Sequence, residues 1–135
     1  MDLRLTGGAH DGGFDMMGTW WGSTEVGVQC KSHWRKGIGV VTVREMEGSI
    51  AAFCDRSKGD MVGVICSHSG FSKFAVMKMK QSGYPMVLVD FNFDRRSIVG
   101  MDVNHQFNHK YPDFIVTKQR ANSPAIFYHN EILTR

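Results

Sequence analysis

Long apolar runs are missing from this sequence of 135 residues. A membrane-spanning helix needs about 18 or more consecutive apolar residues, and no stretch approaches that length. The first residues also lack the basic and then apolar pattern of a secretory signal peptide. We find neither an internal repeat nor a low-complexity linker. We therefore expect no membrane contact and one soluble, intracellular domain over residues 1–135, which is long enough to bury a core.

Cysteine is scarce and odd in number, which argues against a disulfide framework. Cys30, Cys54 and Cys66 all lie in apolar runs, so we expect buried free thiols in a reducing compartment. Cys30 and Cys66, together with His33 and His68, are residue types that bind zinc, but their spacing fits no common zinc motif. We also expect Cys30 to be no nucleophile, because it should point away from Lys31 into the core.

Charge is moderate and nearly balanced. Sixteen basic residues against 13 acidic ones give a formal net charge of +3, and the isoelectric point is near 8.9. This suits a polyanionic partner such as DNA, although many slightly basic proteins bind none. An apolar share of 42% with 21% charged residues is ordinary for a globular protein and shows no signature of disorder.

The first half of the chain predicts three strands and a helix. Alternating and apolar segments bounded by glycines indicate strands at residues 3–6, 14–21 and 26–32, with a hairpin loop at residues 22–25. Apolar residues then recur at intervals of three or four, which predicts a helix over residues 42–54. Gly48 inside this helix should serve close packing against the sheet, because a helical glycine otherwise costs about 1 kcal/mol.

The second half predicts a strand, a helix and a strand. Residues 61–66 are a nearly unbroken apolar run, Ser72 begins a helix that ends near Gly83, and residues 85–91 form the next strand. A right-handed crossover makes these strands parallel. Weaker signals follow: a short helix within residues 103–110 and strands at residues 114–118 and 125–128. The fold class is therefore α/β, a mixed sheet flanked by helices.

The candidate site lies on the predicted hairpin. Asp15 closes the glycine-rich turn of residues 7–15, and Gln29 and Lys31 share one face of the following strand, with Cys30 on the other. A divalent cation could lie between Asp15 and Gln29. Alternatively, Asp15 caps a turn and Lys31 is a solvated strand residue. Asp11, between glycines, fits a turn former as well as a residue near the metal.

These residues resemble the catalytic core of the PD-(D/E)xK nucleases, in particular the Mrr-like restriction endonuclease branch, in which a QxK motif is common. Residues 43–48 (VREMEG) and 70–75 (GFSKFA) are similar to two further segments of that branch. Residues 18–21 (GTWW) and 124–128 (PAIFY) look more like its fungal mitochondrial "required for respiratory growth" offshoot. The resemblance covers roughly residues 5–92, and the remainder matches loosely.

The resemblance implies a restriction-endonuclease-like fold and a metal-dependent DNA endonuclease that uses Mg²⁺, with Mn²⁺ as a substitute. Asp15, the Gln29 side-chain oxygen and the backbone carbonyl of Cys30 would be the metal ligands, since Mg²⁺ prefers hard oxygen donors. Lys31 would orient or deprotonate the attacking water, or stabilise negative charge on the phosphate. Glu45, on the next helix, would lie beside the active site and hold Lys31, or else be an ordinary solvent-facing residue.

Several residues near the site are candidates for DNA contact. Phosphate contacts and base stacking would involve a basic and aromatic loop and three further side chains, namely His33, Trp34, Arg35, Lys36, Arg44, Ser72 and Lys73. The loop could equally be solvated around one buried Trp. Ser72 could equally be a plain N-cap.

The chain departs from the family pattern in one respect. We expect that the N-terminal helix of the family, which contributes another acidic residue, is missing here, and Gln29 is neutral. The alternative to an enzyme is therefore a non-catalytic DNA-binding or assembly module that retains the nuclease fold, and a third reading is a structural subunit of a larger complex. An active enzyme would act as a homodimer on methylated duplex or, if mitochondrial, on branched recombination intermediates.

Overall fold

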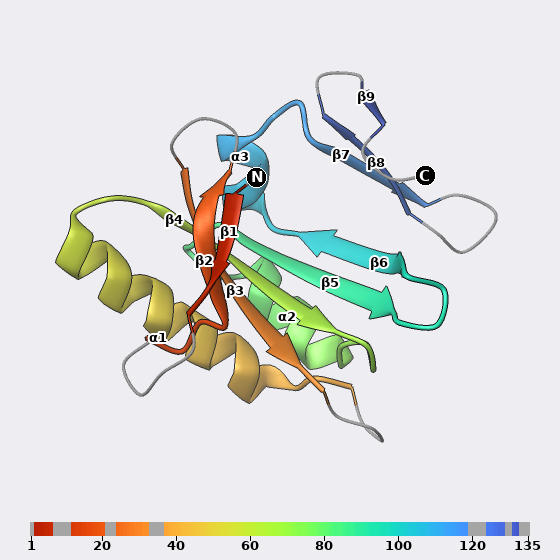
Figure 1. Cartoon of the computed structure of the whole chain (residues 1–135), viewed down its shortest axis with the longest axis horizontal. Coiled ribbons are helices and arrows are strands. Elements are labelled where there is room, and N and C mark those ends of the chain that lie inside the picture. The colour runs from red at the N-terminus through yellow and green to blue at the C-terminus, as the bar shows by residue number, and fades with distance from the viewer. Residues whose placement is uncertain are drawn as a thin grey trace.

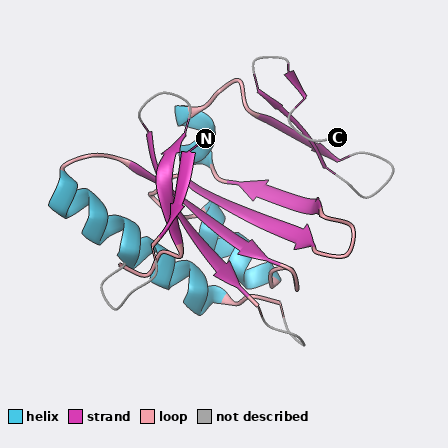
Figure 2. Cartoon of the chain, viewed as in Figure 1, coloured by secondary structure: helices cyan, strands magenta, loops and turns pink. Residues whose placement is uncertain are grey.

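The computed structural model describes residues 2–6, 12–20, 24–32, 37–118, 124–128 and 131–132. Over these residues the chain forms a six-stranded mixed sheet, a small three-stranded sheet and three helices (Figures 1 and 2). This confirms the predicted α/β class. None of the described helices is long and apolar enough to cross a membrane.

The large sheet has its strands in the order in which they occur along the chain. Strands β1 to β3 form antiparallel pairs, β3, β4 and β5 are parallel, and β6 returns antiparallel to β5. The strands are β1 (Asp2–Leu5), β2 (Met16–Trp20), β3 (Thr24–Lys31), β4 (Met61–Ser67), β5 (Met86–Asn92) and β6 (Ser97–Val103). The small sheet consists of β7 (Ile115–Lys118), β8 (Pro124–Tyr128) and β9 (Glu131–Ile132).

Two helices cover one face of the large sheet. Helix α1 (Val40–Ser57) connects β3 to β4, and α2 (Lys73–Lys80) connects β4 to β5. Because both crossovers advance in the same direction across the sheet and such crossovers are right-handed, both helices lie on the same side, as Figure 1 shows. We call this side the covered face and the opposite side the grooved face.

The covered face holds a tightly packed core. Val43, Met46 and Ile50 of α1 are fully buried and follow the spacing that predicted this helix. A Cβ atom at Gly63 of β4 would lie 2.6 Å from Cδ1 of Ile50, so the absence of a side chain there lets α1 approach the sheet. The role predicted for Gly48 is wrong: it is exposed, and a Cβ there would contact nothing within 4 Å.

The helix limits differ in detail from the predicted ones. Helix α1 extends by two residues at its start and three at its end, and it stops where Lys58 adopts a left-handed conformation with φ of 57°. The Ser72 hydroxyl accepts a hydrogen bond from the Ala75 amide at 3.1 Å, which confirms the predicted N-cap of α2. That helix ends at Lys80, before Gly83.

The grooved face is covered at one end by aromatic side chains. Helix α3 (His105–Lys110) and the residues after it place Phe107, Tyr111 and Phe114 around Trp20 of β2. The ring centroids of Trp20 lie 6.0 to 6.2 Å from the other three. Aromatic pairs at these separations stabilise a core beyond their buried area.

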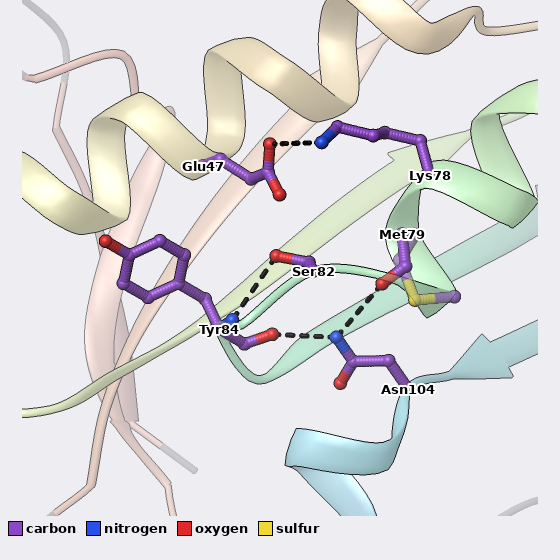
Figure 3. Close-up of polar contacts among 6 residues, drawn as sticks. All are labelled: Glu47, Lys78, Met79, Ser82, Tyr84 and Asn104. Atoms are coloured by element: carbon purple, nitrogen blue, oxygen red, sulfur yellow. Dashed lines mark hydrogen bonds and ion pairs between the residues drawn. The ribbon is translucent and has the colours of Figure 1, made fainter.

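Asn104 links the two faces. It is 1% exposed, and its Nδ2 group donates to the carbonyl oxygens of Met79 (3.1 Å) and Tyr84 (2.7 Å), as Figure 3 shows. Its Oδ1 atom accepts from the amides of Met86 (3.1 Å) and Phe107 (3.0 Å), so the same side chain is the N-cap of α3. One buried side chain therefore joins α2, β5 and α3.

Two further contacts in Figure 3 secure the covered face. The Glu47 carboxylate of α1 lies 3.4 Å from Lys78 Nζ of α2, so an ion pair connects the two helices. The Tyr84 amide donates to the Ser82 hydroxyl at 3.3 Å, which fixes the turn into β5.

Candidate active site on the β2–β3 hairpin

Backbone hydrogen bonds hold Asp15 directly before β2. Its amide donates to the Val28 carbonyl at 2.8 Å, and its carbonyl accepts from the Thr6 amide at 2.9 Å. The Asp15 Oδ2 atom accepts from the Cys30 amide at 2.7 Å. Asp15 thus fills the structural role that the sequence left open, but an ionised carboxylate has about four lone-pair sites, so capacity for a cation remains.

Gln29 carries an unusual polar atom. Its Nε2 group donates to the Gly13 carbonyl at 3.0 Å, whereas its Oε1 atom is buried and has no hydrogen-bond partner among the described residues. Leaving a buried acceptor unpaired costs about 1–3 kcal/mol, and such atoms in folded proteins call for an explanation. A bound cation would satisfy this oxygen.

The hairpin brings the predicted metal ligands together. Asp15 contacts Cys30, and Gln29 contacts the turn that ends at Asp15. Because the N–H and C=O groups of an extended residue point to the same strand edge, the Cys30 carbonyl also faces the Asp15 side. A carboxylate, an amide oxygen and a backbone carbonyl are donors that fit Mg²⁺. The described residues contain no group of three or more His, Cys, Asp and Glu side chains for a metal, so binding here depends on the two neutral oxygens.

Lys31 is paired with Glu45. Val26 and Val28 belong to the core of the grooved face, so the alternation of β3 directs Gln29 and Lys31 to the covered face. The Lys31 Nζ atom lies 3.7 Å from Glu45 Oε2, and the Lys31 side chain is 27% exposed. The prediction that Glu45 of α1 lies beside Lys31 is confirmed, and the catalytic roles of both stay predictions.

The candidate DNA contacts are only partly described. Arg44 and Lys73 are exposed near the starts of α1 and α2, and hydrogen bonds of Ile38 to Gly70 and Ser72, each 2.9 Å, tie these two helix starts together. Four predicted contacts, His33, Trp34, Arg35 and Lys36, lie outside the described residues, as does Asp11.

Asp90 is a candidate site residue that the sequence analysis missed. The register aligns Lys31 with Ser67 and Ser67 with Asp90, and the alternation of β5 directs Asp90 to the same face as Lys31. Burial raises the pKa of the Asp90 carboxyl, partly opposed by a hydrogen bond from the Gly70 amide. Two strand spacings, roughly 10 Å, separate Asp90 from Lys31. The sequence signal that could have identified Asp90 is a single carboxylate within an otherwise apolar strand.

The prediction of buried cysteines is wrong. Cys30 is exposed, and Cys54 and Cys66 are half-buried; all three are free thiols. Cys30 and Cys66 point to the grooved face, where the packing of the described residues is open, so an apolar strand sequence does not bury them. A hydrogen bond from Cys66 lowers the pKa of the Cys30 thiol to about 7, and the same hydrogen bond raises the pKa of Cys66. Cys30 does point away from Lys31, as predicted.

Fold and site together define a mixed α/β domain with a candidate cation site on its N-terminal hairpin. Residues 21–122 match the model of the family described as Required for respiratory growth protein 7. Because this match spans most of the chain, the chain belongs to that family. No curated protein and no solved structure matches it. The sequence resemblance to the respiratory-growth family is thus confirmed, and kinship with the PD-(D/E)xK nucleases stays a prediction.

Proposed function

We propose that the protein is a metal-dependent DNA endonuclease that hydrolyses phosphodiester bonds. The observation that carries the proposal is the buried Gln29 Oε1 atom, which has no hydrogen-bond partner among the described residues. Gln29 contacts the turn before Asp15, the Asp15 carboxylate accepts from the amide of the neighbouring Cys30, and Lys31 lies on the same face as Gln29. The spacing of Gln29 and Lys31, which resembles the QxK motif of Mrr-like nucleases, supports the same reaction class.

The donor set fits a hard divalent cation. Asp15, Gln29 and the Cys30 carbonyl would hold Mg²⁺, and Mn²⁺ would substitute because it accepts the same oxygen ligands. A bound divalent cation neutralises charge on the phosphate and acidifies the attacking water. With one charged ligand, Asp15 carries most of the electrostatic attraction.

Lys31 supplies positive charge next to the proposed metal. The Glu45 carboxylate lies 3.7 Å from the ammonium, and this ion pair favours one position of the Lys31 side chain. An ammonium fixed in this way suits stabilisation of the charge that develops on phosphate, or orientation of the water, better than removal of a proton. Glu45 is therefore a positioning residue.

The surroundings favour a polyanionic substrate. Arg44 and Lys73 are exposed near the starts of α1 and α2, and the chain carries a net charge of +3. Such side chains contact phosphates and position the duplex without reading its sequence. The predicted contacts of residues 33–36 would extend this surface.

The test is cleavage of plasmid, linear, flap and four-way-junction DNA with Mg²⁺ or Mn²⁺ by three proteins: wild type, Lys31→Ala and Arg95→Ala. Arg95 is exposed in the β5–β6 turn, so its variant matches the change in net charge. Loss of Lys31 should slow cleavage by about 100-fold or more, and Arg95→Ala should leave it unchanged. Absence of cleavage by the wild type, or equal cleavage by Lys31→Ala, would overturn the proposal.

A second candidate function is a non-catalytic DNA-binding or assembly module. It is favoured by the single carboxylate of the donor set, because a neutral Gln29 weakens the hold on a cation. Salt-dependent DNA binding that is unchanged by a chelator, with no cleavage of any substrate, would support this function over the enzyme.

Cutting both strands of a duplex needs two sites related as the strands are, and we therefore propose that the active form is a homodimer. Sedimentation at micromolar concentration should give a dimer, and a monomer there argues against it. The name of the family suggests a role in mitochondria. Branched or recombination-intermediate DNA of the mitochondrial genome would then be the substrate, in genome maintenance.

A further inference from the structure

The grooved face contains an open groove of about 500 Å³. Its walls are mostly apolar, and they come from all six strands of the large sheet, from Leu3 of β1 to Met101 of β6. The thiols of Cys30 and Cys66 line the groove beside apolar side chains, among them Val28, Val64, Val89 and Phe91. Cys30 is exposed and Cys66 is half-buried.

The two thiols face each other across neighbouring strands. Cys30 of β3 and Cys66 of β4 are partners in the parallel register, and both line the same groove. Adjacent strands are about 4.8 Å apart, within the range of about 4.4–6.8 Å that Cα atoms of disulfide-linked cysteines span. Directly opposed Cβ atoms must move slightly closer to form the bond, and a bond formed under such strain is readily reduced.

We propose that Cys30 and Cys66 form a reversible disulfide when the protein meets a peroxide. Cys30 is the thiol oxidised first, because it is the exposed one. The expectation that Cys30 is no nucleophile assumed a side chain buried in the core. The Cys30 thiolate attacks the peroxide, the O–O bond breaks, and the products are a Cys30 sulfenic acid and one water or alcohol. Cys66 then attacks the Cys30 sulfur, the S–S bond forms, and the sulfenic oxygen leaves as water with the Cys66 proton. Two thiols lose two electrons, and the peroxide is reduced.

The disulfide would affect the candidate active site through the backbone of β3. Cys30 lies between Gln29 and Lys31, its amide donates a hydrogen bond to the Asp15 carboxylate, and its carbonyl is a proposed metal ligand. Drawing Cys30 towards Cys66 shifts the backbone that positions Gln29, Lys31 and the Cys30 carbonyl. This consequence rests on the proposed function, whereas formation of the disulfide does not.

The chemical test oxidises the reduced full chain with hydrogen peroxide, alkylates the remaining thiols and locates the linkage by peptide mass spectrometry. We expect a Cys30–Cys66 linkage within one chain that dithiothreitol removes. Cys66→Ser should leave a Cys30 sulfenic acid that dimedone traps, and Cys30→Ser should leave Cys66 unoxidised. Cys54→Ser, the matched control on α1, should form the linkage as the wild type does. Free thiols after peroxide treatment, or a linkage that involves Cys54, would overturn the inference.

The functional arm compares cleavage by the oxidised, the reduced and the re-reduced protein. We expect at least a tenfold loss on oxidation and full recovery on reduction, in wild type and in Cys54→Ser alike. A disulfide that leaves cleavage unchanged refutes the regulatory consequence. A disulfide in a protein that cleaves no DNA refutes the proposed function and leaves the inference about the thiols standing.

Discussion

The two faces of the large sheet use similar residues but are built differently. On the covered face, α1 and α2 pack onto the strands, and Met46, Ile50 and Met79 have no exposed surface. On the grooved face, α3 and its aromatic neighbours cover one end, and a groove remains over the Cys30–Cys66 pair. The difference follows from chain topology, because two crossovers of the same hand place both connecting helices on one side.

The two faces of the sheet therefore have different roles in the proposed site. The covered face packs two helices against the strands and directs Lys31 towards Glu45 of α1. The grooved face exposes the Cys30 thiol, which lies one residue from both Gln29 and Lys31. Strand β3 therefore directs Lys31 towards Glu45 of α1 and presents the Cys30 thiol to the groove.

The largest expected effect is on the covered face. Ile50→Ala removes a fully buried side chain that contacts the sheet at Gly63, and the loss of transfer free energy and the resulting cavity should lower the free energy of unfolding by about 3–4 kcal/mol. Urea denaturation followed by circular dichroism measures this.

The matched substitution on the other face is Phe93→Ala. Phe93 lines the groove and is 65% exposed, so the free energy of unfolding should change by no more than about 0.5 kcal/mol. Equal destabilisation by the two variants would contradict the distinction between the faces.

An intermediate effect is expected where the faces are joined. Asn104→Ala removes four hydrogen bonds from a buried position, and the unpaired backbone groups and the lost N-cap should cost about 2–4 kcal/mol of unfolding free energy. Asn108→Ala, at an exposed position of the same helix, is the control and should have a small effect. Similar thermal stability of the Asn104 variant and the wild type would show that this side chain does not join the layers.

Much of the fold follows from local pattern. The spacing of Val43, Met46 and Ile50 predicts α1, and unbroken apolar runs predict β4 and β5 as parallel neighbours. The contact between Lys31 and Glu45 also follows, because only residues 32–39 separate the end of β3 from the start of α1.

Other features are set by tertiary structure. Strand β6 was missed because Gly100 and Asp102 interrupt its apolar residues and the strand is half-buried throughout. The exposure of Cys30 depends on which face of the sheet the helices cover, and no local sequence pattern predicts which face that is. Gly48 is exposed in α1, and nothing in the structure explains its presence there.

Cation binding at Asp15 tests the proposed site without depending on the choice of DNA substrate. Mn²⁺ titration monitored by electron paramagnetic resonance should show one bound ion per wild-type chain. Asp15→Asn should bind about tenfold or more weakly, because the only charged ligand is lost, and Asp94→Asn, at an exposed position in the β5–β6 turn, should bind as the wild type does. No bound ion in the wild type, or equal affinity in the Asp15 variant, would contradict a metal site on this hairpin.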